Sequence, residues 1–293
     1  MNKPFQFLSV IAVAAIVALG AVRVSPNSRR QDATISSQQP VYDRVVRTKT
    51  LRCGYVVFPP TIIKDPNTGA MSGILYDAIE KAAAKIGIKV EWATEVNWGD
   101  YLTALQYNHA DMICAASWNN TPEEWLQTES IGPLFYSGIG VWVRANDDRF
   151  TGHIDRINDP NVTIASIDGM IPGRIAAVDF PKAKVISLPQ ITDYTFNLMN
   201  VVNGKADVTF VENSQGMAFN EKNPSVLKNI AAENPIRIYP DVFLAPKGEQ
   251  KLKNTFDRIF QDMINNGEME QIIRKYEKYP GSFYRVAKPY QAR

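Results

Sequence analysis

The segment 51–111 constrains the fold of this chain more than any other, because short apolar runs alternate in it with helical patterns. Residues 51–57 form a mostly apolar run that is too short for a helix. Pro59 and Pro60 follow closely, and proline lacks a backbone donor and breaks helices. We therefore expect a buried strand that ends in a rigid loop.

The same segment continues with two helical patterns separated by a strand. Apolar side chains recur at helical spacing from Leu75 to Ile86, and a second helical pattern covers 101–105. Strands are expected at 89–93 and 111–116. This order, with its short connections, is typical of a parallel sheet covered by helices, and it favours a ligand-binding cleft.

The second half of the chain repeats the alternation of strands and helices. The helix end and the Asp-led strand before 212 resemble those at 108–114, which indicates two similar lobes. Strands are expected at 162–166, 184–186, 207–212 and 241–244, a helix closes at 200–205, and a final helical pair covers 252–263 and 269–276.

The composition fits an ordinary globular protein and narrows the class of partner. Of the 293 residues, 45% are hydrophobic and 21% are charged. The formal net charge is +2, and the sequence contains no cluster of Lys and Arg interleaved with aromatic residues. We therefore predict that nucleic acid is not a partner.

Residues 1–24 differ from the rest of the chain. The run 5–24 is mostly apolar and follows Lys3, which is typical of an export signal or of a single membrane anchor. Small residues near the end of the run suit cleavage, whereas Arg23 and the arginines after it resist translocation, so both alternatives stay open. Either one predicts a periplasmic or extracytoplasmic protein, free or tethered. Residues 25–46, rich in Ser, Asn, Gln and Arg, are predicted to be a flexible linker.

Two cysteines and two histidines limit the covalent and metal chemistry. Cys53 and Cys114 each lie inside an apolar strand pattern, so we expect two buried thiols. The alternative, a disulfide, requires that the two strands be neighbours. His109 and His153 do not form a recognisable zinc site or catalytic triad with other residues. We predict no metal and no cofactor.

A series of short motifs resembles one protein family in its order and spacing. The motifs are Leu51-Arg52-Cys53-Gly54 with Pro59-Pro60, Gly73 and Asp77, then Trp98, Ala104-Leu105, Asp111, Thr121-Pro122-Glu123, Pro133-Leu134-Phe135-Tyr136, Gly204-Lys205-Ala206-Asp207 and Ala245-Pro246-Lys247-Gly248. Together they resemble the family 3 extracellular solute-binding proteins, which are the polar amino-acid receptors of ABC importers. The resemblance extends from Thr48 to Tyr276.

This resemblance implies a two-lobed α/β fold of the type 2 periplasmic binding protein class, with the ligand between the lobes. Lobe one would comprise 47–137 and 242–293, and lobe two would comprise 138–241 with the hinge segments. The two hinge crossings are expected near 136–140 and 235–241. Ligand would bind at the C-terminal ends of the strands, and closure would present a distinct surface to a membrane permease.

Several positions that the resemblance assigns to the cleft depart from the family pattern. The Arg that binds the ligand carboxylate in the family is replaced by Glu124, and small hydroxyl residues after Gly169 are replaced by Met170 and Ile171. The Asp that binds the ligand ammonium is represented by Glu212. The residues expected to line the cleft are Phe58, Trp98, Ala115, Ser117, Trp118, Glu124, Gly169, Met170, Arg174 and Glu212.

Structural roles compete with ligand binding at most of these positions. The tryptophans either contact ligand or cover apolar surface beneath a loop. We interpret Glu124 as a solvated carboxylate in the first turn of a helix, where the helix dipole favours it. Arg174 is the alternative candidate for the ligand carboxylate. Asp77 and Asp111 are expected to be structural capping or turn residues.

The leading prediction is an exported, non-enzymatic binding protein that captures a small polar solute, amino-acid-like or an amine, by hinge closure. The acidic residues Glu124 and Glu212, together with several Trp, suit an amine through charge and cation-π attraction. We expect a monomer whose closed form is recognised by an ABC permease or a membrane sensor.

Two other classes of function stay open. One is a membrane-anchored sensory or accessory module with a diverged pocket. The other is a dehydratase-like enzyme on the same fold, in which Glu124 or Glu212 serves as acid or base. No residue is predicted to be catalytic, because the sequence shows no distinctive catalytic constellation.

Overall fold

The computed structural model describes residues 39–287 of the chain. The predicted export signal or anchor at 1–24, and the predicted linker as far as residue 38, lie outside the described residues. Within residues 39–287, no helix is both long enough and apolar enough to cross a membrane.

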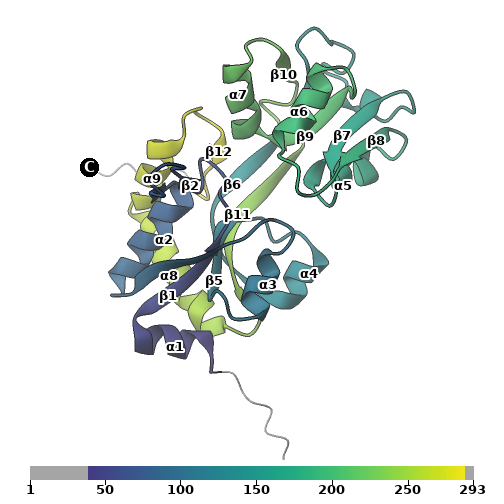
Figure 1. Cartoon of the computed structure of the whole chain (residues 1–293). Helices are drawn as coiled ribbons and strands as arrows, with labels where there is room; N and C mark the ends of the chain where they lie inside the picture. Colours follow the sequence, from purple (N-terminus) through teal and green to yellow (C-terminus); the bar gives the residue numbers. More distant parts are fainter. Residues whose placement is uncertain (1–38, 288–293) are drawn as a thin grey trace, which may run out of the picture. The chain divides into compact units, whose positions relative to one another are not determined.

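One large sheet runs through the described part of the chain (Figure 1). In order of contact its strands are β4 (Lys89–Glu95), β1 (Thr50–Tyr55), β5 (Met112–Ser117), β11 (Arg237–Pro246), β6 (Thr128–Arg144), β9 (Val208–Glu212), β7 (Thr163–Ile167) and β8 (Lys184–Leu188). The short strands β10 (Leu227–Asn229) and β12 (Phe283–Tyr284) also pair with β6, whereas β2 (Ile63–Lys64) and β3 (Met71–Ser72) pair only with each other.

The helices connect the strands in the alternating order that the sequence predicts. They are α1 (Val41–Thr48), α2 (Ile74–Lys85), α3 (Tyr101–Gln106), α4 (Pro122–Gln127), the short 3-10 helix Ile154–Ile157, α5 (Ile171–Asp179), α6 (Thr195–Val202), α7 (Asn213–Lys222), α8 (Gln250–Asn265) and α9 (Glu268–Tyr276). The predicted α/β class is therefore confirmed.

Two antiparallel strands connect two parallel groups. β1 pairs in parallel with β4 and β5, and β7 pairs in parallel with β8 and β9, as predicted. β6 and β11 are antiparallel to each other and run side by side between these groups (Figure 1). The local pattern does not reveal that β6 is one strand of 17 residues, because Gly132 and Pro133 interrupt it.

Buried apolar side chains form separate clusters on the two sides of the β6–β11 pair. The clusters around α2 and α3 draw on residues 45–135 and 242–283. The clusters around α5 and α6 draw on residues 139–231. Burial of apolar surface contributes most to the stability of the folded protein. Each group of clusters would therefore stay packed if the connecting strands β6 and β11 bent. The residue boundaries of the two lobes stay a prediction.

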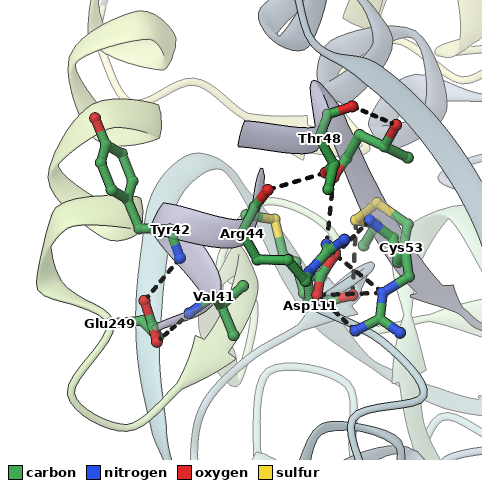
Figure 2. Close-up of polar contacts among 11 residues, drawn as sticks. Val41, Tyr42, Arg44, Thr48, Cys53, Asp111 and Glu249 are labelled. Carbon is green, nitrogen blue, oxygen red and sulfur yellow. Dashed lines mark hydrogen bonds and ion pairs between the residues drawn. A yellow bond between two sulfur atoms is a disulfide. The ribbon is translucent and has the colours of Figure 1, made fainter. Parts of the chain in front are cut away.

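The predicted flexible linker ends earlier than expected, because Val41–Thr48 form helix α1. The backbone N–H groups of Val41 and Tyr42 donate to the Glu249 carboxylate at 2.7 and 3.1 Å (Figure 2). Such first-turn donors have no partner within the helix, so a carboxylate there stabilises it. The prediction of a linker over 25–46 is wrong at its end, because the stabilising acceptor lies 208 residues away in the sequence.

The carboxylate of Asp111 is buried and serves a structural role, as predicted. It accepts hydrogen bonds from the backbone N–H of Arg52 at 2.7 Å and from the Arg52 guanidinium at 2.9 Å. Arg44 of α1 pairs with the same carboxylate (Figure 2). The ion pairs of Asp111 therefore join α1, β1 and the start of β5.

We expect Asp111→Asn to lower the free energy of unfolding by about 3 kcal/mol, because two guanidinium groups lose their charged partner. Urea unfolding of the purified protein measures this difference. The matched control is Asp77→Asn, since Asp77 pairs with Lys275, whose side chain is 61% exposed. The control should cost less than about 1 kcal/mol. Equal losses in the two variants would contradict the role assigned to Asp111.

The expectation of two buried thiols is wrong, because Cys53 and Cys114 form a disulfide. Their Cα atoms are 5.4 Å apart, within the range that a disulfide requires. β1 and β5 are parallel neighbours, and Cys53 lies opposite Met112, two residues before Cys114. Residues two apart on a strand share a face, so the pairing of the strands brings the two side chains together.

Candidate ligand-binding site

Two buried carboxylates lie where β6, β9 and β11 meet. Glu212 ends β9 opposite Ile139 of β6, and Asp241 lies on β11 opposite Phe135. Their exposed fractions are 6% and 0%. Ser137 of β6 donates to Asp241 Oδ2 at 2.7 Å, and its hydroxyl also acts on the pKa of Glu212, so Ser137 lies near both acids. We refer to Glu212 and Asp241 as the carboxylate pair.

The environment of the carboxylate pair disfavours its negative charge. Burial raises the pKa of Glu212 to about 7, and the nearby hydroxyls of Ser137 and Ser214 oppose this rise. Burial also raises the pKa of Asp241 well above its usual value, and the charge of Glu212 raises it further. Among residues 39–287, no basic side chain contributes to the pKa of either group. The carboxylate pair therefore keeps a proton at neutral pH unless a cation from outside neutralises it.

Two stacked aromatic side chains adjoin the carboxylate pair. Trp118, which follows β5, donates through Nε1 to Asp241 Oδ1 at 3.3 Å. Its ring stacks on Tyr239 with centroids 4.8 Å apart and an interplanar angle of 11°. Tyr239 precedes Asp241 by two positions on β11, so both side chains lie on the same face. The half-buried Trp118 thus packs against Tyr239 and contacts the acid at the same time.

A second group of aromatic side chains connects two distant parts of the chain. Phe58 lies edge-to-face with Trp98 at 5.9 Å and with Tyr194 at 6.0 Å between ring centroids. Burial and the charges of Asp193 and Glu212 raise the pKa of Tyr194 to about 12, so Tyr194 lies within electrostatic range of the carboxylate pair. Trp98 also packs on the apolar cluster around α3. Its predicted roles in the cleft and in packing are therefore compatible.

The interpretation of Glu124 as a solvated carboxylate is wrong, because its side chain is only 3% exposed. Its Oε1 accepts from the Tyr101 hydroxyl at 2.6 Å and from Ser117 Oγ at 2.9 Å. Its Oε2 accepts from the backbone N–H groups of Asn120 and Thr121, both at 2.8 Å. Residue 124 does lie in the first turn of a helix, where it forms a capping box with Thr121. Glu124 thus accepts from four donors, one of which is Ser117. Both side chains therefore stabilise the structure of the site.

Arg174 extends from α5 toward the loop that precedes α4. Its Nη1 donates to Asn120 Oδ1 at 2.7 Å, and its Nη2 donates to the carbonyl oxygen of Gly169 at 2.8 Å. The positive charge of Arg174 acts on the Tyr101 and Tyr239 hydroxyls, opposing the pKa increase that burial causes in both. Arg174 is therefore within electrostatic range of both aromatic groups.

The remaining residues predicted to line the cleft are Gly169, Met170 and Ala115. Gly169 has a φ of +75° and is exposed, so it permits the tight turn between β7 and α5. Met170 precedes α5 and is half-buried. The side chain of Ala115 is wholly buried in the apolar cluster around α3, so only its backbone is available to a ligand.

The most important residue that the sequence analysis missed is Asp241. The sequence predicts it only as the first residue of an apolar strand, Asp241-Val242-Phe243-Leu244. A carboxylate that begins an otherwise apolar strand is a signal for a site, since a buried acid needs a specific partner. The other neighbours of the site that were missed are Tyr101, Asn120, Ser137, Tyr194 and Tyr239.

A cavity of about 770 Å³ lies elsewhere, between α9 and residues 280–287. Its charged residues Glu270, Arg274, Glu277 and Arg285 pair with one another. Since these charges are already neutralised, the cavity offers no uncompensated group to a ligand, unlike the carboxylate pair.

Comparison with known sequences gives a consistent match. Residues 51–279 match the family described as bacterial extracellular solute-binding proteins, family 3. A probable amino-acid ABC transporter-binding protein of Haemophilus influenzae is 24% identical over 248 residues, which are 84% of this chain and 92% of that protein. The membrane-bound lytic murein transglycosylase F of Cronobacter sakazakii is 21% identical over 287 residues, but only 51% of that protein is matched.

Solved structures of similar proteins support the predicted fold. An ancestral amino acid-binding protein, AncCDT-1, described as a precursor of cyclohexadienyl dehydratase, has a TM-score of 0.67, is 23% identical, and matches over 82% of this chain and 100% of that one. A putative ABC transporter binding component from Wolinella succinogenes, complexed with lysine, has a TM-score of 0.68, is 18% identical, and matches over 79% and 97%. At such identities the likeness establishes the fold alone, and it confirms the type 2 periplasmic binding protein class.

Proposed function

Because the chain belongs to the bacterial extracellular solute-binding proteins of family 3, we propose that it captures a small polar solute, amino-acid-like or an amine, and delivers it to an ABC permease. It would act as a monomer on the outer side of the cytoplasmic membrane. The observation that carries this proposal is the carboxylate pair, which is buried and has no cationic partner among residues 39–287.

A ligand ammonium group supplies the positively charged partner that the carboxylate pair lacks. Buried carboxylates without a partner cost free energy, and a bound cation removes that cost while forming charge-assisted hydrogen bonds. Trp118 and Tyr239 lie beside Asp241, so their rings add cation-π attraction and exclude water. Together these groups favour a cation over a neutral or anionic solute.

Hinge closure would couple capture to delivery. β6 and β11 carry Ser137 and Asp241 and also connect the separate apolar clusters. Other direct contacts also join the two predicted lobes. Among them are the hydrogen bonds from Gln215 Nε2 to the carbonyl oxygen of Pro59 at 2.8 Å and from Arg174 Nη1 to Asn120 Oδ1 at 2.7 Å, and the Phe58–Tyr194 ring contact. A ligand that touches both sides would therefore shift the population toward the closed form.

A thermal-shift screen of amino acids, polyamines and small organic acids tests the proposal. Amines and cationic amino acids at about 100 times their Kd should raise the Tm by about 5 °C or more, because binding stabilises only the folded state. Small organic acids should not raise the Tm, because they bring a further negative charge to the site. If no small molecule stabilises the protein, the binding function is refuted.

A second candidate function is acid–base catalysis on the same fold. The pKa of about 7 for Glu212 suits a general acid or base at neutral pH. We rank it second because Glu212 lies near Asp241, to which Trp118 donates, and these groups also suit a bound cation. Nuclear magnetic resonance spectra of any ligand found, recorded during incubation with the protein, would show turnover if the second candidate is right.

A further inference from the structure

The segment that follows α9 is fixed to that helix by charged side chains that are mostly buried. Arg285 donates to Glu270 of α9 at 2.8 Å and to Glu277 at 2.7 Å, and the three side chains are at most 19% exposed. The Glu277 carboxylate also accepts from the backbone N–H of Phe283 at 3.1 Å, and Phe283 is buried in the apolar cluster around α2. We refer to residues 277–285 as the strap. The strap thus belongs to the same side of the β6–β11 pair as α2 and α9.

The strap also contacts α7, which belongs to the other side of the β6–β11 pair. Lys278 Nζ lies 2.6 Å from each carboxylate oxygen of Glu221, and the Tyr279 hydroxyl donates to the same carboxylate at 2.5 Å. Glu221 lies near the end of α7, and Phe219 of the same helix is buried in the apolar cluster around α6. The contacts of Glu221 therefore connect the two groups of apolar clusters without using β6 or β11.

Between these two attachments the strap passes the first predicted hinge crossing. Its strand β12 pairs with Tyr136 and Ser137 of β6, on the edge that β9 occupies from Ile139 onward, whereas β11 occupies the other edge. The Tyr284 ring covers Gly138, since a Cβ atom at Gly138 would lie only 2.7 Å from Tyr284 Cε2. The strap therefore packs directly on the part of β6 that is expected to bend.

The strap and the rim of the candidate site lie on opposite sides of the hinge strands. In Figure 1, α7, β12 and α9 lie to the left of β6 and β11, whereas α4 and α5 lie to their right. A rotation about β6 and β11 that changes the separation of α4 and α5 therefore also moves α7 relative to α9. Because the strap is fixed to α9, such a rotation must stretch or break the contacts of Glu221.

We propose that the strap limits the hinge motion of β6 and β11 by holding Glu221 of α7 on the α9 side of the molecule. Conformations that lose the ion pair and the tyrosine hydrogen bond are higher in free energy, so they are less populated. This inference concerns the protein without ligand and goes beyond the proposed function. It assigns a regulatory role to a segment outside the candidate site.

Double electron–electron resonance between two spin labels tests this proposal on the purified protein without ligand. The labels are attached at Ala84→Cys of α2 and Ala177→Cys of α5, which are exposed positions in the two groups of elements. The native cysteines are bonded to each other and wholly buried, so they do not take up label. Glu221→Ala removes the contacts from α7, and Lys278→Ala removes the ion pair from the strap. Thermal unfolding shows that each variant is folded.

The matched control is Glu95→Ala, which removes a similar group of contacts from one side of the molecule. Glu95 accepts from Lys64 at 2.6 Å and from the Tyr55 hydroxyl at 3.3 Å, and its side chain is 50% exposed, against 49% for Glu221. The three residues of the control lie on β4, β2 and β1, so none of their contacts crosses the β6–β11 pair.

Glu221→Ala and Lys278→Ala should each broaden the distribution of distances between the labels. The population outside the main wild-type peak should rise about two- to fivefold, the range for loss of an exposed ion pair. Glu95→Ala should reproduce the wild-type distribution. The inference is overturned if both strap variants keep the wild-type distribution, or if Glu95→Ala broadens it as much as they do. Because no ligand is added, the outcome is separate from that of the binding screen.

Discussion

Replacing Glu212 by Gln should weaken binding of an amine-bearing solute by about 100-fold, and it should stabilise the protein without ligand. The loss of affinity follows because truncating a buried charge pair typically costs a few kcal/mol. The gain in stability follows because the folded protein no longer ionises a buried carboxyl at alkaline pH. The difference between the usual pKa of 4.5 and about 7 corresponds to about 3 kcal/mol.

The size of the stabilisation by Glu212→Gln depends on pH. The pKa of Glu212 is higher in the folded protein than in the unfolded chain, so the folded state binds more protons between about pH 4.5 and 7. The stabilising contribution is fully present below pH 4.5 and is lost as the pH rises through 7. The free energy of unfolding of Glu212→Gln minus that of the wild type should therefore be near zero at pH 4 and about 3 kcal/mol at pH 8.

Urea unfolding at the two pH values and calorimetric titration at pH 6, 7 and 8 provide the measurements. Affinity of the wild type for an amine should rise about tenfold per pH unit below pH 7, since the carboxylate pair must release a proton. Glu233→Gln, an exposed carboxyl in the same half of the chain, should change neither quantity. Undiminished affinity in Glu212→Gln, or a stability difference independent of pH, would show that this acid is not the ligand's partner.

Removing the disulfide should lower the free energy of unfolding by about 4 kcal/mol. The Cys53–Cys114 bond closes a loop of 61 residues, and a crosslink of that length removes much of the entropy of the unfolded chain. The double variant Cys53→Ala/Cys114→Ala tests this in urea, with wild-type protein in a strong reductant as the parallel measurement. The double variant should lose at least as much stability as the reduced wild type, and reductant should have no effect on the double variant.

The same experiment separates the contribution of the crosslink to stability from that of side-chain packing. Both cysteines are wholly buried in the largest apolar cluster, so a loss of packing alone also destabilises the variant. Reduction of the wild type keeps both sulfur atoms in place and therefore isolates the effect of the crosslink. If reduced wild type is as stable as oxidised wild type, the crosslink does not contribute to stability.

Local sequence patterns were sufficient for most helices and strands and for part of the site. Apolar periodicity and turn residues are properties of neighbours in the chain, so the parallel groups and their connections were predictable. The resemblance assigns Phe58, Trp98, Trp118 and Glu212 to the cleft. In the structure Phe58 contacts Trp98 and Tyr194, the charge of Glu212 acts on Tyr194, and Trp118 donates to Asp241. Their contact with a ligand stays a prediction.

The sequence by itself determined the alternation of strands and helices and the type of residue available at each position. Only the tertiary structure decided which of these residues meet. Glu124 is buried because Tyr101, 23 positions earlier, donates to it, and Asp241 joins the site through Ser137, 104 positions earlier. The cysteines meet across 61 positions, and α1 depends on Glu249 at a separation of 208. Such pairings depend on how strands are ordered in the sheet, and no local period or propensity encodes that order.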